Sequence, residues 1–442
     1  MEYVFVGGRP SSNLDYSYNS INLTKNLLIS MIDVLNSGNS HSKAHSFFKA
    51  LSEMNSVYRK SINYNIFLDS GGYSIIVGDV RGSQTREFIE RYVNRILEGK
   101  LIYDYVFSLD IPIFLNEPQY NTKDHIYQFN RNSLELTYFK ARQDDILKNK
   151  LYFVWHFKIK EQYDIWSSLY EDLKLNDVVV NYAAGGMVGL RGITQIEFSP
   201  FIAPIFRCLY SYINSDMKHP FRFHALGVYI QHDRFFLWIL EKLFKYYLNR
   251  DDVVITYDSV NYMRTAQLRS RDLDIFYFNK EDNKIELFKH INCPIDIRKF
   301  IYGTNIDIFN IEIENVKNNC KMNDVGAFVP LNIYSNLQLD AYFKYIIDKY
   351  DILNSFLSGN MINIFASLNN INPILFTTQR INSLKTNFRK LWNFHQWFIK
   401  SKKLDNLNEL IYDFIKDINF PASLTDANKL TISNNHLDSV LI

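Results

Sequence analysis

"YNIFLDSGG" (residues 64–72) is followed by an amphipathic stretch, "SQTREFIERYVNRILEGK" (83–100), and then by a second apolar run, "YDYVFSLDIP" (103–112). The two apolar runs are short and rich in β-branched and aromatic residues, which is typical of strands, whereas the stretch between them has a helical period. This order predicts a βαβ unit, in which two parallel strands are joined by a right-handed crossover.

The same alternation continues on both sides of this unit. Another amphipathic stretch lies at 233–250, and the other strand-like runs are "YVFVGG" (3–8), "LYFVWHF" (151–157), "DVVVNYAAGG" (177–186), "FRFHALGV" (221–228) and "DDVVITYDS" (251–259). Seven or eight such units in about 300 residues predict an α/β fold, a (β/α)₈ TIM barrel with a helical C-terminal extension. Neither Gly-x-Gly-x-x-Gly after the first strand nor a Walker A motif occurs, which argues against dinucleotide-binding and P-loop folds.

The alternation of strands and helices fades after about residue 280. We therefore expect residues 1–280 to form the barrel and 281–335 to form an irregular insertion with short strands such as "KIELF" (284–288). Residues 336–442 have a helical pattern and predict a helical C-terminal region, which ends in a polar tail from about Pro421.

Composition and charge indicate a folded protein without an obligatory polyanionic partner. Of 442 residues, 47% are hydrophobic and 22% charged, and the formal net charge is only +2. Cys208, Cys293 and Cys320 lie far apart, which favours free thiols in a reducing compartment. The N-terminus lacks the features of a signal peptide, and no run approaches the roughly 18 apolar residues of a membrane span. We expect a cytoplasmic protein that does not contact a membrane.

Polar residues and glycines fall at the carboxyl ends of the expected strands. They are Asp69, Asp110, His156, Gly185, Gly186, Gly227 and Asp258. In a (β/α)₈ barrel this is the face on which active sites are built.

Two carboxylates at separate strand ends suggest glycosidic chemistry. One would attack an anomeric carbon and the other would act as general acid/base on the leaving group; Asp69 and Asp258 are the candidates. Glycines beside them would let a flat ligand approach backbone N–H donors, and Tyr73 offers an aromatic face. Taken singly, an Asp at a strand end such as Asp69 is more often a capping or loop residue, and Tyr73 could simply plug the barrel mouth.

Five segments in order give this chain a recognisable pattern. "DSGGYS" (69–74), "SLDIP" (108–112), "YAAGGMVG" (182–189), "HALGV" (224–228) and "TYDSVNYMR" (256–264) resemble the active-site segments of the tRNA-guanine transglycosylase superfamily, over roughly residues 60–270. The resemblance implies an enzyme, a glycosyltransferase that exchanges a guanine in nucleic acid for a 7-deazaguanine through a covalent glycosyl–enzyme intermediate.

Matched segment by segment, the resemblance assigns a role to each position. It implies that Asp258 is the nucleophile, Asp69 the general acid/base, and Asp110 the carboxylate that reads the N1–H and amino edge of guanine. It further implies a base pocket in which Gly185 and Gly186 offer backbone donors and Tyr73 and Leu226 sandwich the purine. His156 stands in this pocket in place of a Gln, and Ser70 and Gly227 complete it. Outside the pocket, Arg264 would contact nucleic acid. An exchanging nucleotide must be unstacked, so we expect a flipped-out or single-stranded guanine.

The chain also departs from the family pattern. The family's zinc motif, C-x-C-x-x-C with a later His, is absent; only Cys293, Cys320 and His290 are available, so we expect no metal and no cofactor. The Glu with which queuine-type enzymes accept a cationic substituent is replaced here by Arg191 or is lost, which favours a base with a neutral (preQ0-like) or otherwise altered 7-substituent. Such divergence resembles the DpdA-type DNA-guanine transglycosylases of phages and bacterial DNA-modification clusters, whose products block restriction nucleases. The expected partner is therefore DNA. The alternatives are a tRNA-guanine transglycosylase and a non-catalytic protein that binds nucleic acid. A helper protein or a homodimer is compatible with each of these functions.

Some of these residues have plainer interpretations. Asp110 could cap a turn before Pro112, and His156 could be a satisfied strand-end histidine. In the segment 377–403, basic residues are interleaved with Trp392 and Trp397, and together they could hold a nucleic-acid strand by phosphate contacts and stacking. The basic residues are Arg380, Lys385, Arg389, Lys390, Lys400, Lys402 and Lys403. The alternative is an amphipathic helix with aromatic side chains facing the core and solvated charges.

Overall fold

Eight short parallel strands, each hydrogen-bonded to the next in chain order and the last to the first, close into a barrel in this computed structural model. The residues that the structure describes are 1–6, 20, 22–31, 35, 41–58, 63–71, 85–111, 122–157, 159–185, 199–215, 218–228, 231–259, 274–318, 325–371 and 375–416. The strands are β1 (Glu2–Val6), β2 (Asn26–Ser30), β3 (Asn65–Asp69), β4 (Tyr105–Phe107), β5 (Leu151–His156), β6 (Asn181–Gly185), β7 (Arg222–Ala225) and β8 (Val254–Ser259). The predicted (β/α)₈ barrel is confirmed.

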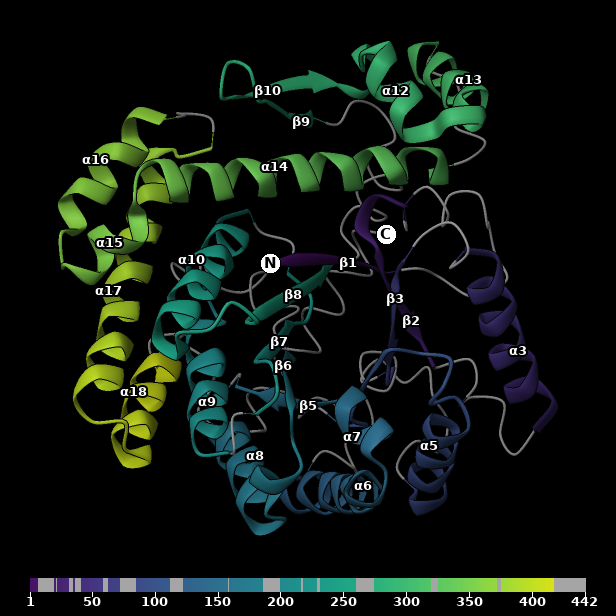
Figure 1. Ribbon diagram of the computed structural model, residues 1–442, viewed down its shortest axis with the longest axis vertical. Helices are drawn as coiled ribbons and strands as arrows, with labels where there is room; N and C mark the ends of the chain where they lie inside the picture. The colour runs from purple at the N-terminus through teal and green to yellow at the C-terminus, as the bar shows by residue number, and fades with distance from the viewer. Residues whose placement is uncertain are drawn as a thin grey trace.

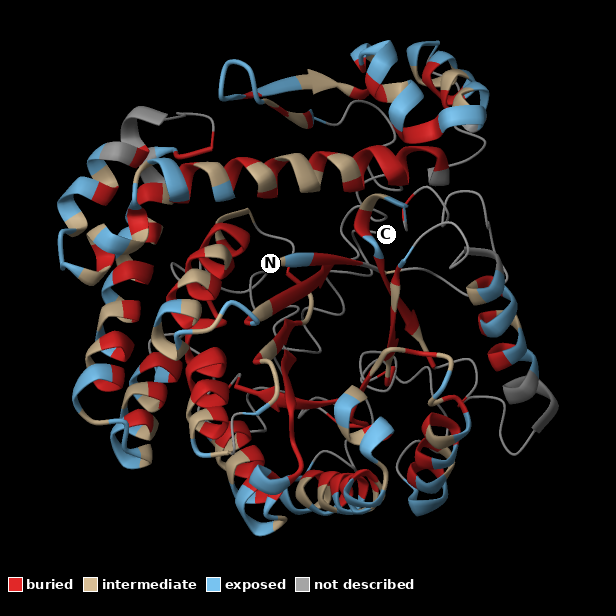
Figure 2. Cartoon of the chain, viewed as in Figure 1, coloured by how far each residue is buried: buried red, intermediate tan, exposed pale blue. Residues whose placement is uncertain are grey.

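Helices surround this barrel and turn their buried faces toward it, as the inward-facing red surfaces in Figure 2 show. They are α3 (His41–Tyr58), α5 (Arg86–Glu98), α6 (Lys123–Gln143), α7 (Asp145–Lys150), α8 (Lys160–Asp172), α9 (Ile202–Ile213) and α10 (Gln231–Leu248).

Helix α5 illustrates why the sequence forms these elements. The Thr85 hydroxyl accepts a hydrogen bond from the Phe88 backbone N–H and caps the first turn. Phe88, Tyr92 and Ile96 recur at helical spacing and are buried. On the outer face of the helix, Arg86 forms an ion pair with Glu90, and Arg91 with Glu87.

Strand β2 was missing from the strands expected on sequence. "NLLIS" is only five residues long and is not bounded by a clear helical pattern, since the hydrophobic periodicity of α3 is weak. The barrel requires it because its register places Leu27 opposite Ile66 and Ser30 opposite Asp69.

The barrel interior is filled with side chains. Val4, Leu28, Phe67, Phe107, Tyr152, Val154 and Ala183 form a separate cluster inside the ring of strands. The rings of Phe67, Phe107 and Tyr152 pack around the imidazole of His224. The barrel is therefore closed below its rim, as expected for an eight-stranded barrel.

The region after the barrel is more regular than expected. It begins with an antiparallel hairpin, β9 (Asp274–Asn279) and β10 (Lys284–Lys289), followed by α12 (Ile295–Tyr302) and α13 (Ile306–Lys317), which share a small core of their own. The hairpin thus starts a few residues before the expected boundary at 280, and helix α14 (Val329–Lys349) starts before 336.

Helix α14 joins the hairpin and α12–α13 to the remaining C-terminal helices, crossing the top of the view in Figure 1. These are α15 (Ile352–Leu357), α16 (Met361–Ile371), α17 (Thr378–Lys400) and α18 (Leu404–Lys416), of which α17 and α18 contact α9. Asp340 on α14 accepts hydrogen bonds from Arg234 on α10, at 3.0 and 2.6 Å, and from Tyr257 on β8. All three side chains are buried, so this charged contact fastens the C-terminal region to the barrel.

Candidate active site at the carboxyl ends of the strands

The carboxyl ends of the parallel strands bring most of the predicted site residues to one rim. Asp69 is the last residue of β3, His156 ends β5, Gly185 ends β6, and Asp258 lies one residue before the end of β8. Asp110 follows β4 by three residues, and Leu226 and Gly227 directly follow β7. The predicted position of these residues on the barrel is confirmed, whereas their chemical roles stay predictions. Tyr73, Gly186, Arg191 and Arg264 lie outside the described residues.

Asp258 is held on one oxygen. Its Oδ1 accepts hydrogen bonds from the Gly227 backbone N–H, at 2.9 Å, and from Nε2 of His224, at 3.1 Å. Gly227 has φ +76°, a conformation that a residue with a Cβ rarely adopts, so glycine is needed to aim its N–H at the carboxylate. In this structure Gly227 contacts Asp258, and its expected contact with the base stays a prediction.

Asp69 is a carboxyl group of this site whose pKa is strongly raised. Burial and the negative charges of Asp258 and Asp110 raise its pKa from 3.8 to about 7, against the opposing effect of hydrogen bonds from the Gly71 backbone N–H and the Ser30 hydroxyl. Gly71 has φ +80°, again a glycine conformation. A carboxyl group with a pKa near neutrality can both give and take a proton at pH 7.

The loop that carries Asp110 is fixed by the helix behind it. The Asn130 side chain on α6 accepts a hydrogen bond from the Ile111 N–H, at 2.8 Å, and donates one to the Ile111 carbonyl, at 3.1 Å. Ser133 on the same helix donates to the Leu109 carbonyl at 2.7 Å. Asp110 is therefore flanked on both sides by anchored backbone.

His156 pairs with Asp110. Its Nε2 lies 2.5 Å from Oδ2 of Asp110, and its ring packs at 4.7 Å against Trp166. The imidazole is 3% exposed, and Nδ1 has no hydrogen-bond partner within the described part of the chain. The structure thus joins two predicted site residues, Asp110 and His156, in a buried pair. Whether His156 contacts a ligand or is only a satisfied strand-end histidine stays open.

Gly185 provides the space that this pair needs. A Cβ at position 185 would lie 3.1 Å from Cε1 of His156 and 3.0 Å from Cγ1 of Val154. The same Cβ would lie 3.4 Å from Cδ1 of Leu226, which is half-buried and packs on the cluster inside the barrel. Ser70 is buried beside Asp69.

We expect Gly185→Ala to displace His156 from Asp110 and to cost about 1–3 kcal/mol of the free energy of unfolding, because a packed interior yields little to an added methyl group. Urea unfolding measures the loss, and histidine NMR measures the displacement. An unchanged His156 resonance together with unchanged stability would contradict the tight fit.

Sequence reasoning missed His224, Thr256, Ser30 and Asn130. His224 and Thr256 were detectable in part, since alternate residues of a strand share a face: Thr256 lies two residues before Asp258, and His224 two before Leu226. Asn130 and Ser30 gave no such signal, because their contacts join separate elements.

The basic segment forms helix α17 with its aromatic side chains turned inward. Trp397 is buried and donates through Nε1 to the Lys403 carbonyl, and Trp392 packs on Phe356 and His395. The amphipathic-helix interpretation is therefore correct for these aromatic residues. Lys385 and Arg389 are exposed, while Arg380 is half-buried and donates to the Leu375 carbonyl at 3.0 Å. Contact of these three cations with nucleic acid stays a prediction.

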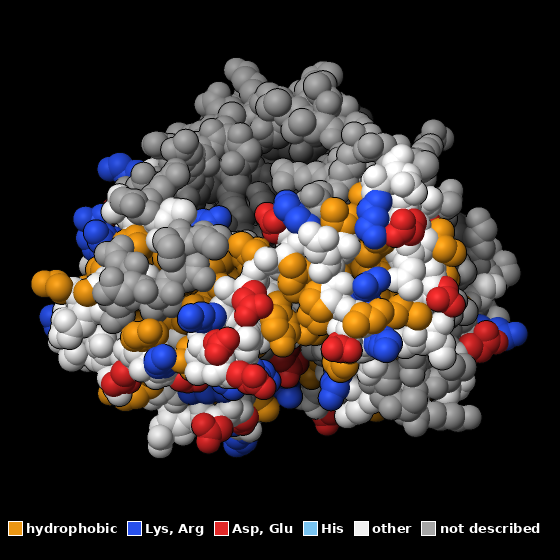
Figure 3. All heavy atoms as spheres, turned by 90° about the horizontal axis from the view of Figure 1, so that it is seen from above, with side chains coloured by type: hydrophobic (Ala, Val, Ile, Leu, Met, Phe, Trp, Pro, Cys, Tyr) orange, Lys and Arg blue, Asp and Glu red, His pale blue; other side chains and the backbone are white. Residues whose placement is uncertain are grey.

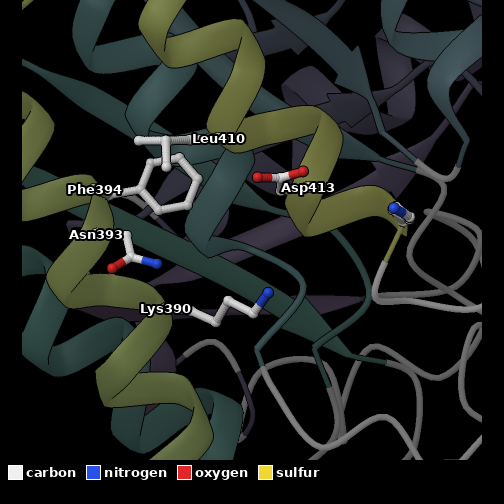
Figure 4. A pocket seen from close by; sticks show the side chains of 6 residues that line it. Lys390, Asn393, Phe394, Leu410 and Asp413 are labelled. Carbon is white, nitrogen blue, oxygen red and sulfur yellow. The ribbon is translucent and has the colours of Figure 1, made fainter.

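Positively and negatively charged side chains are intermixed on the surface that Figure 3 shows. On the face shown in Figure 3, the Lys and Arg side chains of the described residues are interspersed with Asp, Glu and apolar side chains. A hollow of about 230 Å³ between α17 and α18 combines both signs as well (Figure 4), with Lys390, Asn393, Phe394, Leu410, Asp413 and Lys416 lining it. Burial lowers the pKa of Lys390 there. Neither feature extends the site at the strand ends.

The residues considered for a metal site serve other contacts. His290 donates a hydrogen bond through Nε2 to Oδ1 of Asn332 at 2.9 Å and stacks on Phe328, and burial lowers its pKa to about 4. Burial raises the pKa of the Cys293 thiol to about 12; Cys320 lies outside the described residues. Among the residues that are described, no three His, Cys, Asp or Glu side chains gather in a metal-binding arrangement, and no helix is long and apolar enough to cross a membrane.

Comparison with known proteins assigns no family. No protein-family model matches the chain. The exocyst complex component SEC10 of Saccharomyces cerevisiae is similar over 166 residues at 25% identity, a match that covers 38% of this chain and 17% of that protein. The chain thus spans less than a fifth of that protein's length, and the likeness is too weak and partial to show a family.

Proposed function

We propose that this chain is a guanine transglycosylase that exchanges a guanine in DNA for a neutral, preQ0-like 7-deazaguanine. The observation that supports this most directly is the presence of two carboxyl groups with different surroundings on one barrel rim. Asp258 is held through Oδ1 by two donors, and Asp69 has a pKa of about 7 because of burial and the charge of Asp258. These are the properties that a nucleophile and a general acid/base need in a double displacement.

In the first step, Oδ2 of Asp258 forms a bond to C1′ of the nucleotide while the C1′–N9 bond breaks. The electron pair of that bond goes to the guanine, which takes the proton of Asp69. In the second step, Asp69 removes the N9 proton of the incoming base, whose N9 attacks C1′ and returns the electron pair of the ester bond to Asp258. Two displacements at C1′ retain the anomeric configuration.

Asp110 would recognise the base. A carboxylate accepts hydrogen bonds from the N1–H and the exocyclic amine of guanine, which present two adjacent donors. The hydrogen bond with His156 fixes which way the Asp110 carboxylate faces, and the anchored loop around it keeps its position. Adenine presents an acceptor at N1, so the same carboxylate would reject it.

The preference for DNA over tRNA rests on the divergence from the tRNA enzymes at Arg191 and at the zinc motif. Incubation with radiolabelled guanine and either single-stranded DNA, duplex DNA or tRNA tests it. We expect label in DNA, with single-stranded DNA labelled faster because its bases are already unstacked. Label entering only tRNA would contradict the DNA assignment, and no label in any of the three would contradict transglycosylation.

A further inference from the structure

His224 lies beneath the carboxylate of Asp258 in the barrel interior. It is 0% exposed, and the rings of Phe67, Phe107 and Tyr152 lie 5.7, 4.9 and 6.4 Å from its own ring. A buried imidazole in aromatic surroundings is costly unless both nitrogens are hydrogen-bonded. Both are: Nε2 contacts Oδ1 of Asp258 at 3.1 Å, and Nδ1 contacts Oγ1 of Thr256 at 2.8 Å.

The proposed role of Asp258 as nucleophile requires an ionised carboxylate, and this requirement assigns the hydrogen of the His224 ring. An ionised carboxylate only accepts, so Nε2 carries the hydrogen that is donated to Oδ1. In the neutral imidazole Nδ1 then accepts from the Thr256 hydroxyl, which also hydrogen-bonds Tyr152. The result is a buried chain of polar groups, from Tyr152 on β5 through Thr256 and His224 to Asp258, that crosses the barrel interior.

The two oxygens of Asp258 are consequently not equivalent. Oδ1 accepts from His224 and from Gly227, whereas Oδ2 receives no hydrogen bond from any described residue. The side chain is 12% exposed, so part of the carboxylate is accessible from the rim.

We propose that His224, oriented by Thr256, is a positioning residue that makes Oδ2 of Asp258 the attacking oxygen and promotes breakdown of the glycosyl ester. This rests on the proposed transglycosylation. In the ester, Oδ1 is a carbonyl oxygen and accepts hydrogen bonds weakly; when the C1′–Oδ2 bond breaks, its electron pair restores the carboxylate, to which both donors then bind more strongly. Interactions that strengthen in the transition state accelerate that step.

The donor should therefore affect the two steps differently. In the first step the carboxylate loses charge, so the His224 hydrogen bond weakens and slightly opposes attack. In the second step the charge returns, so the same bond helps. Loss of the donor should leave adduct formation nearly intact and slow its turnover, which a residue with only a packing role would not do.

Three variants test this. His224→Phe removes both nitrogens but fills the space, His224→Gln retains an N–H donor, and Thr256→Val removes the hydroxyl at nearly constant volume. With labelled nucleic acid, we expect His224→Phe to slow decay of the trapped adduct roughly 10- to 100-fold, in line with the loss of one hydrogen bond to a charged group. His224→Gln should restore most of the rate, and Thr256→Val should have an intermediate effect. Adduct decay in His224→Phe at the wild-type rate would overturn the proposal.

A second measurement separates this inference from the proposed function. In ¹⁵N NMR of the wild-type protein, the His224 ring, assigned by its loss in His224→Gln, should show the hydrogen on Nε2, and both ring signals should shift in Asp258→Asn. If wild-type protein forms no adduct, transglycosylation is refuted, but these shifts still decide the contact. A hydrogen on Nδ1, or a ring indifferent to Asp258→Asn, would overturn the proposed orientation whatever the activity.

Discussion

Asp258→Asn is expected to abolish covalent trapping of nucleic acid and to lower base exchange by at least about 10³-fold, since removal of a nucleophile eliminates the covalent route. The substitution is conservative in shape. The side-chain oxygen of Asn can still accept from Gly227 and His224, which hold Oδ1 at 2.9 and 3.1 Å, while the amide nitrogen replaces the attacking Oδ2. Loss of activity would therefore reflect the chemistry rather than collapse of the rim.

A substitution at Asp251, just before strand β8, provides a matched control. Asp251 is exposed and precedes β8, so Asp251→Asn changes the net charge equally without touching the site. Gel shift of denatured enzyme on labelled oligonucleotide measures the adduct, and label exchange measures turnover. An adduct of normal yield on Asp258→Asn would show that another residue is the nucleophile. The same variant should also lower the pKa of Asp69, because the Asp258 charge is among the causes that raise it.

Asp69→Asn should have opposite effects on activity and stability. Activity should fall roughly 10²- to 10⁴-fold, because the amide can neither protonate the leaving guanine nor deprotonate the incoming base. Stability should rise at neutral and alkaline pH, because the wild-type protein must then hold an ionised carboxylate among buried groups and next to Asp258 and Asp110.

The direction in which this stability difference changes with pH follows from the raised pKa of Asp69. Between pH 4 and 7 the unfolded chain has ionised Asp69 while the folded protein retains its proton, so the contribution of this group to the free energy of unfolding falls as pH rises and is constant above about 7. The gain in the free energy of unfolding on Asp69→Asn should thus be small at pH 4, grow to about 2 kcal/mol by pH 8, and then level off. One pKa unit corresponds to about 1.4 kcal/mol, and the gain is smaller than the full pKa shift implies because the Asp69 side chain is partly exposed to solvent.

Urea unfolding of both proteins at pH 4.5, 6 and 8 measures this difference. Asp251→Asn is again the control, and its effect on stability should not depend on pH in this way. A stability gain for Asp69→Asn that is the same at all three pH values would contradict the raised pKa, and full exchange activity would contradict its role as acid/base.

The barrel and the position of its rim could be predicted from local patterns. Each of the apolar runs ending in Asp69, His156, Gly185 and Asp258 is a strand, and parallel strands necessarily bring their carboxyl ends to one face. What local patterns do not encode is the partner of each group. The contact of Asn130 with Ile111, or of Ser30 with Asp69, depends on how separate elements pack. Strand β2 was missed for a related reason: five residues give little periodicity, and its place is determined by barrel closure.

The buried contact of Arg234 and Tyr257 with Asp340 bears on how this protein can be cut and recombined. Tyr257 is the immediate neighbour of Asp258, and its hydroxyl is bound by a carboxylate from a helix 83 positions further along the chain. A fragment ending after β8 would lose the Asp340 carboxylate that binds Arg234 and Tyr257, and it would expose the Phe235 ring, which packs on Phe343 of α14. The minimal unit for expression, or for transplanting the site into another scaffold, therefore extends at least through α14, although the barrel itself is complete at Ser259.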